Sequence, residues 1–178
     1  PVVVGTIWKW LLNTDFGLIN SFLSQLNLIT NNISWLSNAN MAMIGILIAN
    51  IWLGIPFNMM LLIGGLTGLP QTVFEAADID GANWFQKLFY LTIPMLKQTI
   101  SATIMLGIIY TFKVFALIWV MTGGGPVNAT NVLPTWSYQL SFDFFNFSQG
   151  AVVANLMFSI MLIFSILYIQ YTSGKEDQ

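Results

Sequence analysis

Glu75-Ala76-Ala77-Asp78-Ile79-Asp80-Gly81-Ala82 is a short acidic stretch between two apolar segments, each long enough to cross a bilayer. Carboxylates are costly to place in lipid, so this stretch belongs outside the hydrocarbon region. The small residues Ala76, Ala77, Gly81 and Ala82 allow another backbone to approach closely. We therefore interpret the stretch as a docking surface rather than as a catalytic site.

The composition indicates an integral membrane protein. Apolar residues make up 56% of the 178 residues and charged residues only 7%, against about 25% charged residues in soluble proteins. The net charge of -2 and the absence of arginine argue against a nucleic-acid partner. Cysteine and histidine are also absent, which removes thiol nucleophiles, disulfides, imidazole bases and the usual zinc ligands. We expect no catalytic residues, no cofactor and no metal.

Long runs without charge predict the membrane-spanning segments. No charged residue occurs between Asp15 and Glu75, and about 20 apolar residues are enough to span a bilayer. The predicted crossings are Met41–Leu66, Lys97–Val120 and Ala151–Tyr171, with Pro1–Leu12 as a truncated first one. The aromatic-rich segments Phe16–Asn40 and Asn131–Gly150 are interpreted as interfacial. We expect residues 1–178 to form one transmembrane domain, the C-terminal part of a longer chain.

The lysines predict the orientation in the membrane. Lys87 and Lys97 flank the acidic stretch, and Lys175 lies in the tail. Because lysine is enriched in cytoplasmic loops, residues 70–94 and the C-terminus are expected to be cytoplasmic. Residues 15–40 and 121–150 then face outward.

Local signals predict a helix-turn-helix around the acidic stretch. Gln71–Ile79 and Asn83–Leu91 are each long enough for about two helical turns. Gly81 between them can adopt the positive φ that a sharp reversal needs. Pro94 fits the first turn of a helix and is expected to start the next spanning helix.

Several motifs closely resemble the cytoplasmic EAA loop of membrane subunits of ABC importers. They are Glu75-Ala76-Ala77, Asp80-Gly81-Ala82, Phe85-Gln86 and Thr92-Ile93-Pro94. The resemblance implies an all-α polytopic membrane bundle with a MetI-like core, in which residues 70–94 form a cytoplasmic helix-turn-helix coupling loop. The implied ATPase-coupling residues are Glu75, Ala76, Ala77, Asp80, Gly81, Ala82 and Pro94.

Further motifs resemble the sugar-type branch of that family, the relatives of the maltose and glycerol-phosphate permeases. They are Asn50–Phe57, Phe112-Lys113-Val114-Phe115, Thr122–Pro126 and Ala129-Thr130. Leu88 stands where the family commonly has Phe, and Ala116 where an Asp often follows Phe115. This second departure leaves the identity of the solute open among disaccharides, longer oligosaccharides and phosphorylated polyols.

The resemblance also implies a function and partners. The chain would form half of a translocation path for a sugar or oligosaccharide in a bacterial or archaeal cytoplasmic membrane. A separate ATPase subunit would bind ATP and magnesium, a second permease subunit would complete a heterodimer, and an extracytoplasmic binding protein would deliver the solute.

Two helical stripes are candidate faces of the substrate path. Asn50, Gly54 and Phe57 recur at i, i+4 and i+7 and offer an amide, a gap and an aromatic ring. The second stripe consists of Gly107, Tyr110, Thr111 and Val114. Amides, hydroxyls and aromatic rings suit a sugar. Small and polar residues also pack membrane helices together, so that explanation stays open.

Two further features lie on the predicted outer side. Gly123-Gly124-Gly125-Pro126 lacks the Gly-Lys-Ser/Thr ending of a phosphate loop. We interpret it as a flexible turn that contacts the binding protein or lines the outer vestibule. Lys113 is interpreted as an anchor whose side chain reaches the membrane interface.

Two other function classes remain as alternatives. A secondary transporter driven by an ion gradient usually carries acidic or histidine side chains inside the membrane. All acidic residues of this chain lie outside the predicted crossings. A membrane-embedded enzyme would need carboxylates or a Ser-Lys pair, but no arrangement of nucleophile and oxyanion donors accompanies the acids.

Overall fold

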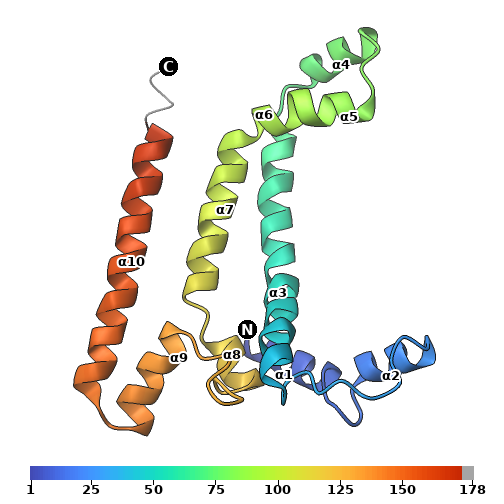
Figure 1. Ribbon diagram of the computed structural model, residues 1–178. Helices are drawn as coiled ribbons and strands as arrows, with labels where there is room; N and C mark the ends of the chain where they lie inside the picture. The colour runs from blue at the N-terminus through green and yellow to red at the C-terminus, as the bar shows by residue number, and fades with distance from the viewer. Residues whose placement is uncertain (174–178) are drawn as a thin grey trace. The chain divides into compact units, whose positions relative to one another are not determined.

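The computed structural model of the chain describes residues 1–173, and every regular element within them is helical. Figure 1 shows long helices linked by shorter helical segments. In chain order the elements are α1 (Val2–Leu11), α2 (Leu18–Gln25), α3 (Ala39–Thr67), α4 (Gln71–Ile79), α5 (Trp84–Gln86), the π-helix η1 (Lys87–Thr92), α6 (Ile93–Met95), α7 (Lys97–Phe112), α8 (Ala116–Met121), α9 (Leu133–Tyr138), the π-helix η2 (Gln139–Asp143) and α10 (Phe147–Ser173).

The chain folds into two compact units. The first unit contains residues 1–53 and the part of the chain from Thr111 onward. The second unit contains residues 54–110. The acidic stretch and both of its flanking short helices therefore lie in the second unit.

The core of the first unit forms where α1 packs against α8 (Figure 1). Gly5 is buried there, and a Cβ atom at this position would lie 3.3 Å from the Val120 Cβ. The missing side chain thus allows the two helices to approach closely. Lys9 donates a hydrogen bond from its Nζ to the Val120 carbonyl oxygen at 3.1 Å. The buried core residues are Leu12, Ile46, Ala49, Leu117, Ile118 and Met121.

A buried asparagine holds the segment around α2. Asn20 is only 2% exposed, and its Nδ2 donates to the Thr14 and Ile33 carbonyl oxygens at 3.2 and 2.9 Å. Its Oδ1 accepts from the Trp35 indole Nε1 at 2.9 Å. Buried amides need such partners, and here they join two stretches of irregular chain. The outer surface of α2 keeps Leu18 and Phe22 exposed.

The short helices α9 and η2 pack against α10 in the first unit. Gly150 is buried at this contact, and its carbonyl oxygen accepts a hydrogen bond from the Ser137 hydroxyl at 2.9 Å. A chain of aromatic contacts extends from the start of α8 to the start of α10. Its members are Phe115, Trp119, Tyr138, Phe142 and Phe147.

In the second unit, the end of α3 and most of α7 run side by side (Figure 1). A Cβ atom at Gly65 would lie 2.8 Å from the Thr99 Cγ2, so this glycine permits the close approach of the two helices. Further along, the Phe57 and Tyr110 rings meet edge to face at 5.7 Å between centroids. The geometry is typical of aromatic pairs.

Two of the predicted crossings are confirmed as long apolar helices. Ala39–Thr67 contains the predicted Met41–Leu66, and Phe147–Gln170 begins four residues before the predicted Ala151. Only 11% and 6% of their most apolar windows are buried within the protein. Helices that are apolar and exposed on nearly all sides suit a lipid environment.

The predicted single crossing over Lys97–Val120 is wrong, because the helix is interrupted. α7 ends at Phe112, residues 113–115 are not helical, and α8 begins at Ala116. Val114 packs against the core of the first unit, and the Phe115 ring stacks on Trp119 at 5.5 Å. These tertiary contacts override the apolar pattern, which by itself favours one helix. The expected truncated segment Pro1–Leu12 corresponds to the short apolar helix α1, Val2–Leu11.

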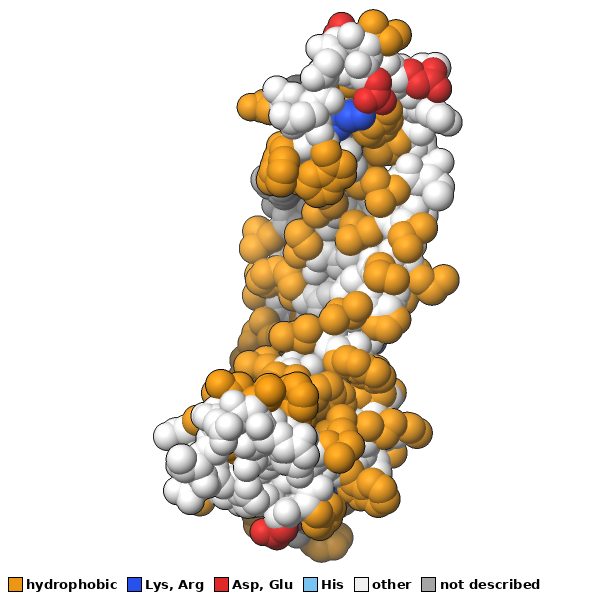
Figure 2. All heavy atoms as spheres, turned by 90° about the vertical axis from the view of Figure 1, so that its right-hand side faces the viewer, with side chains coloured by type: hydrophobic (Ala, Val, Ile, Leu, Met, Phe, Trp, Pro, Cys, Tyr) orange, Lys and Arg blue, Asp and Glu red, His pale blue; other side chains and the backbone are white. Residues whose placement is uncertain are grey.

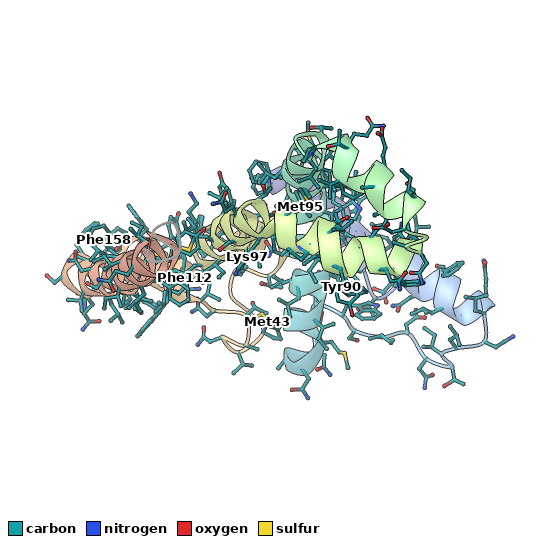
Figure 3. All side chains as sticks on the ribbon, turned by 90° about the horizontal axis from the view of Figure 1, so that it is seen from above. Met43, Tyr90, Met95, Lys97, Phe112 and Phe158 are labelled. Carbon is teal, nitrogen blue, oxygen red and sulfur yellow. The ribbon has the colours of Figure 1, made fainter. Side chains whose placement is uncertain are left out.

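The expected start of the next spanning helix at Pro94 is also wrong. Helical structure continues from Trp84 to Met95, beyond the predicted Leu91, and Pro94 lies in α6, before α7 begins at Lys97. The two segments, Trp84–Met95 and Lys97–Phe112, are bent by 70°. Figure 3 shows Met95 and Lys97 on the two sides of this bend, with Tyr90 on the preceding segment. Proline lacks an N–H group, so a π-helical turn and a bend beside it are physically consistent.

Candidate functional site

The acidic stretch lies in a helix-turn-helix formed by α4, a four-residue turn and the α5–η1–α6 segment, residues 71–95; we call this region the acidic helix-turn-helix. The helix predicted over Gln71–Ile79 is confirmed with the same bounds. Gly81 has a φ of 75°, as the turn requires. The Ala82 amide donates to the Ala77 carbonyl at 2.9 Å and the Gly81 amide to the Asp78 carbonyl at 3.1 Å. This pair of bonds is the Schellman motif that ends a helix at a left-handed glycine.

A capping box begins the second half of the acidic helix-turn-helix. The Asn83 Oδ1 accepts a hydrogen bond from the Gln86 backbone N–H at 2.9 Å, and the Asn83 backbone N–H donates to the Gln86 Oε1 at 2.8 Å. These reciprocal bonds satisfy two of the backbone donors that the start of a helix leaves open. The turn is therefore fixed by local bonds of its backbone and of the Asn83 and Gln86 side chains.

Most of the predicted coupling residues are exposed. Glu75, Ala76, Asp80 and Gly81 are exposed, whereas Ala77 and Ala82 are half-buried. A Cβ atom at Gly81 would meet nothing within 4 Å. Figure 2 shows acidic side chains gathered at the end of the second unit that α4 and α5 form. Acidic and small side chains are thus exposed together on this surface.

Sequence reasoning missed two features of this surface. Lys87 forms an ion pair with Asp78, which links η1 to α4 across the turn. Ile79 and Trp84 are 87% and 64% exposed, and the Trp84 ring packs edge to face against Phe85 at 5.0 Å. Large apolar side chains beside the carboxylates give the surface an apolar part. The spacing of Trp84 and Phe85 directly after the turn was the available signal for it.

The structure confirms the first predicted stripe as part of one helix and corrects the second. Asn50, Gly54 and Phe57 all lie on α3. Gly107, Tyr110 and Thr111 lie on α7, but Val114 lies beyond its end. Val114 instead packs against the core of the first unit, since the helix stops two residues earlier. Within the second unit the Phe57 and Tyr110 rings are in contact, so an aromatic residue from each stripe meets its counterpart.

The glycine turn, residues 122–131, is held firmly by side chains. Gly123 and Gly124 have positive φ values of 62° and 92°, and the Gly125-Pro126 peptide bond is cis. The buried Thr130 hydroxyl contacts the Gly125 carbonyl at 2.6 Å and the Thr122 hydroxyl at 2.7 Å. The Gln139 Nε2 donates to the Gly123 carbonyl at 3.1 Å. The sequence predicts a flexible turn here, but these hydrogen bonds hold it in one conformation.

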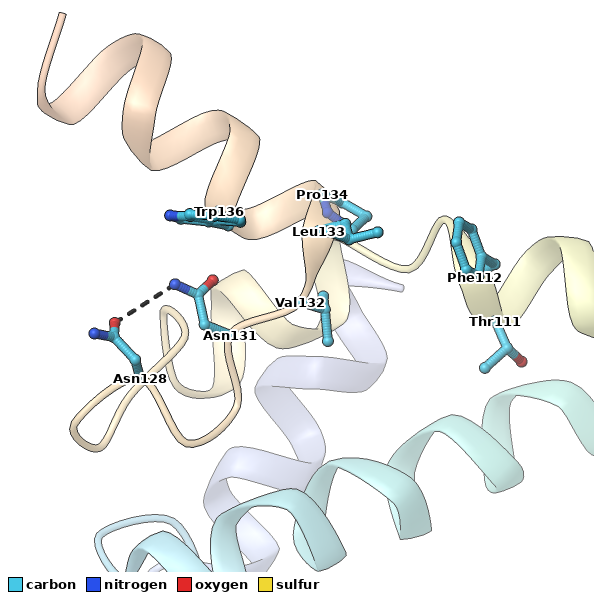
Figure 4. A pocket seen from close by; sticks show the side chains of 8 residues that line it. All are labelled: Thr111, Phe112, Asn128, Asn131, Val132, Leu133, Pro134 and Trp136. Carbon is cyan, nitrogen blue, oxygen red and sulfur yellow. Dashed lines mark hydrogen bonds between the residues drawn. The ribbon is translucent and has the colours of Figure 1, made fainter. Parts of the chain in front are cut away.

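A pocket of about 630 Å³ opens beside the glycine turn in the first unit. Figure 4 shows Trp136 on one side of it, with Asn128 and Asn131 facing the ring from the loop. Its lining consists of Thr111, Phe112, Asn128, Asn131, Val132, Leu133, Pro134 and Trp136. Of these only Thr111 was a predicted site residue. The sequence assigned the aromatic residues from Asn131 to Gly150 to the membrane interface and gave no signal that two asparagines would face Trp136.

These features define a class of protein: a polytopic, all-helical membrane protein with an exposed acidic helix-turn-helix. Residues 1–174 match the family described as the inner membrane component of binding-protein-dependent transport systems. The chain therefore belongs to that family and is an integral membrane protein.

Curated relatives agree with this assignment. A probable ABC transporter permease protein of Brucella suis is 36% identical over 96% of this chain and 59% of its own length. The trehalose/maltose transport system permease protein MalF of Thermococcus litoralis is 33% identical over 99% of this chain and also 59% of its own length. The chain thus spans about three fifths of these relatives.

The fold is also similar to a solved structure. A bacterial ABC transporter involved in the import of the acidic polysaccharide alginate matches with a TM-score of 0.86. The match covers 97% of this chain and 60% of the other, at 18% sequence identity. At this identity the likeness establishes the all-helical permease fold and nothing about the solute.

Proposed function

We propose that this chain is the membrane-spanning subunit of an ATP-driven ABC importer. It forms half of a translocation path for a sugar or oligosaccharide and has no ATPase site of its own. The observation that carries the proposal is the acidic helix-turn-helix, in which local bonds fix the turn and Glu75, Asp80 and Gly81 are exposed. The family and the relatives, which include a trehalose/maltose permease, support the same function.

The acidic helix-turn-helix is the proposed coupling element. Glu75 and Asp80 supply negative charge to a groove on a separate ATPase subunit, which binds ATP and magnesium. Ala76, Ala77, Gly81 and Ala82 allow close backbone contact there. When the ATPase closes, its movement is transmitted through the bend after Pro94 to α7. This arrangement requires residues 70–94 to be cytoplasmic. The prediction that the C-terminus is also cytoplasmic depends on Lys175, which lies outside the described residues.

The remaining partners follow from the same proposal. A second, different permease subunit completes the path along Asn50, Gly54 and Phe57 on α3 and Gly107, Tyr110 and Thr111 on α7. An extracytoplasmic binding protein delivers the solute to the outward side, where the glycine turn, including Gly123-Gly124-Gly125-Pro126, lies. The subunit carries no cofactor.

Charge reversal at Glu75 tests the coupling. Glu75→Lys should leave the subunit inserted and assembled but reduce sugar uptake by roughly tenfold or more, because opposed like charges at an interface cost several kcal/mol. Uptake and ATP hydrolysis are measured in proteoliposomes that contain the full-length complex. Asp143→Lys is the matched control, since Asp143 is an exposed acid on η2, outside the acidic helix-turn-helix. Wild-type uptake by Glu75→Lys would refute the docking role.

Two substitutions test the path. Asn50→Leu removes an amide from α3, and Tyr110→Ala removes the ring that contacts Phe57. Each should reduce uptake severalfold without reducing the amount of assembled complex. Unchanged uptake kinetics in both variants would show that these faces only pack helices together.

The energy source is tested by collapsing the ion gradients while ATP is kept high. Uptake should be unaffected, and a loss of uptake would favour a secondary transporter.

A further inference from the structure

The pocket beside the glycine turn combines an aromatic platform with amide groups. Trp136 is 47% exposed, so a large part of its indole surface is free for contact. Asn128 and Asn131 face it from the loop, while Phe112, Leu133 and Pro134 supply apolar surface (Figure 4). The volume of about 630 Å³ lies within the range of roughly 300–1,000 Å³ that small-molecule sites occupy.

The two asparagines differ in how many hydrogen bonds hold their side chains. The Asn131 Nδ2 donates to the Gln139 Oε1 at 2.7 Å, and the Asn131 Oδ1 accepts from the Thr135 hydroxyl, so this side chain is fixed. The Asn128 Oδ1 accepts a weaker bond from Asn131 at 3.5 Å. Within the described residues the Asn128 Nδ2 has no hydrogen-bond partner, and the side chain is exposed. It is therefore a donor available to a ligand.

The backbone at Asn128 is held in an uncommon conformation. Val127 and Asn128 have φ values of 49° and 61°. A left-handed φ is rare for a β-branched residue such as valine, and it persists only where surrounding contacts enforce it. The Ala129 backbone N–H donates to the Pro126 carbonyl oxygen at 2.9 Å, and the Asn131 backbone N–H donates to the Asn128 backbone carbonyl oxygen at 3.1 Å. These bonds fix the direction from which the Asn128 amide enters the pocket.

The pocket carries no charge. Every residue that lines it is an amide, a hydroxyl or an apolar side chain. A carboxylated or phosphorylated solute would lose hydration there without gaining a cationic partner. An uncharged sugar instead offers hydroxyl groups to amides and an apolar ring face to an indole.

We propose that this pocket is an outer saccharide subsite, in which Trp136 stacks against one ring of an uncharged sugar and Asn128 donates a hydrogen bond to a hydroxyl oxygen. One residue that lines the subsite, Thr111, also belongs to the stripe on α7. A solute bound there would contact Thr111, the last residue of the stripe on α7. The inference rests on the proposed sugar function and narrows it to neutral saccharides.

The test measures direct sugar binding, so that the affinity of the binding protein does not enter. The full-length subunit is assembled with its second permease subunit and its ATPase in nanodiscs, and radiolabelled maltotriose, trehalose and glycerol 3-phosphate are the probes. Saturable binding of a neutral sugar to the wild-type complex is expected. Trp136→Ala should raise its Kd by about fivefold and Asn128→Leu by two- to threefold, as loss of one aromatic contact and one hydrogen bond implies.

The controls separate ligand binding from packing. Trp136→Phe keeps an aromatic face and should stay within about twofold of the wild-type Kd. Trp10→Ala removes an indole that is 71% exposed on α1 and does not line the pocket. It should bind as the wild type does. The ratio of the two permease subunits in each purified complex is measured, because loss of the second subunit from Trp136→Ala would overturn the proposal in favour of a packing role.

The outcomes also separate this inference from the proposed function. Sugar uptake by the wild-type importer, measured in proteoliposomes with the binding protein, tests the function alone. If neutral sugar is imported but Trp136→Ala and Asn128→Leu bind like the wild type, or the wild type shows no saturable binding, the subsite is wrong and the function stands. If only the phosphorylated probe is imported or bound, the neutral subsite is wrong. If no probe is imported, the sugar function and the subsite both fail.

Discussion

The acidic helix-turn-helix and the glycine turn are both reversals of the chain, but different bonds hold them. The acidic helix-turn-helix is closed by backbone bonds at Gly81 and by the capping box of Asn83, and its carboxylates are exposed. The glycine turn is closed by side-chain hydroxyl groups, above all that of Thr130, which is 0% exposed. The acidic helix-turn-helix therefore keeps Glu75 and Asp80 exposed, whereas the glycine turn depends on hydrogen bonds from the side chains of Thr122, Thr130 and Gln139.

This difference separates stability from recognition. In the acidic helix-turn-helix, substitutions of exposed side chains should alter contact with a partner and barely affect folding. In the glycine turn, substitution of the buried Thr130 should destabilise the protein, because its polar partners would be left unpaired. The exposed edge of the same turn, at Asn128, is free to bind.

The largest expected effect is on the stability of the glycine turn. Thr130→Val keeps the shape of the side chain but removes the hydroxyl that bonds to the Gly125 carbonyl and to Thr122. The free energy of unfolding should fall by about 1–3 kcal/mol, because the part-buried Gly125 carbonyl and Thr122 hydroxyl each lose a partner. The measurement is the Tm and the denaturant midpoint of the purified protein in detergent.

Thr30→Val is the control for this substitution. Thr30 is exposed, so its replacement should change stability by less than about 0.5 kcal/mol. Equal effects of the two substitutions would mean that the buried hydroxyl network does not hold the glycine turn, and the contrast between the two reversals would disappear.

A smaller effect is expected at Gly81. Gly81→Ala places a Cβ atom in open space, so its cost of about 1 kcal/mol comes only from the positive φ. Hydrogen exchange of residues 80–82 should become roughly fivefold faster as the turn opens more often. Gly64→Ala also adds a methyl group where nothing lies within 4 Å, but on the helix α3. It should not accelerate exchange, and equal acceleration in both would show that the backbone conformation is not the cause.

The same contrast explains how much the sequence could predict. The bounds of α4 and the turn at Gly81 follow from neighbouring residues, and both predictions are confirmed. The apolar helices α3 and α10 follow from composition over long windows. Turn and capping signals act within a few residues, and the apolar pattern of a spanning helix extends over about twenty residues, so both can be recognised in a single sequence.

Features that depend on distant contacts were not predictable. The helix break at residues 113–115 is imposed by the packing of Val114 and Phe115 against other parts of the first unit. The buried Asn20 meets Trp35 fifteen residues away. The pocket residues Asn128 and Trp136 come together only because the glycine turn has one particular shape. No periodicity or local propensity encodes such contacts, since tertiary packing decides them.

The smallest effect is expected at the ion pair of the acidic helix-turn-helix. Asp78 is 62% exposed and Lys87 24% exposed in their side chains, so the pair should contribute only about 0.2–1 kcal/mol. A double-mutant cycle with Asp78→Asn and Lys87→Gln measures this coupling in the free energy of unfolding. Salt should weaken it further, because exposed charges are screened. A coupling above about 2 kcal/mol that persists in high salt would contradict the comparison, because the acidic helix-turn-helix would then also be held together by its charged side chains.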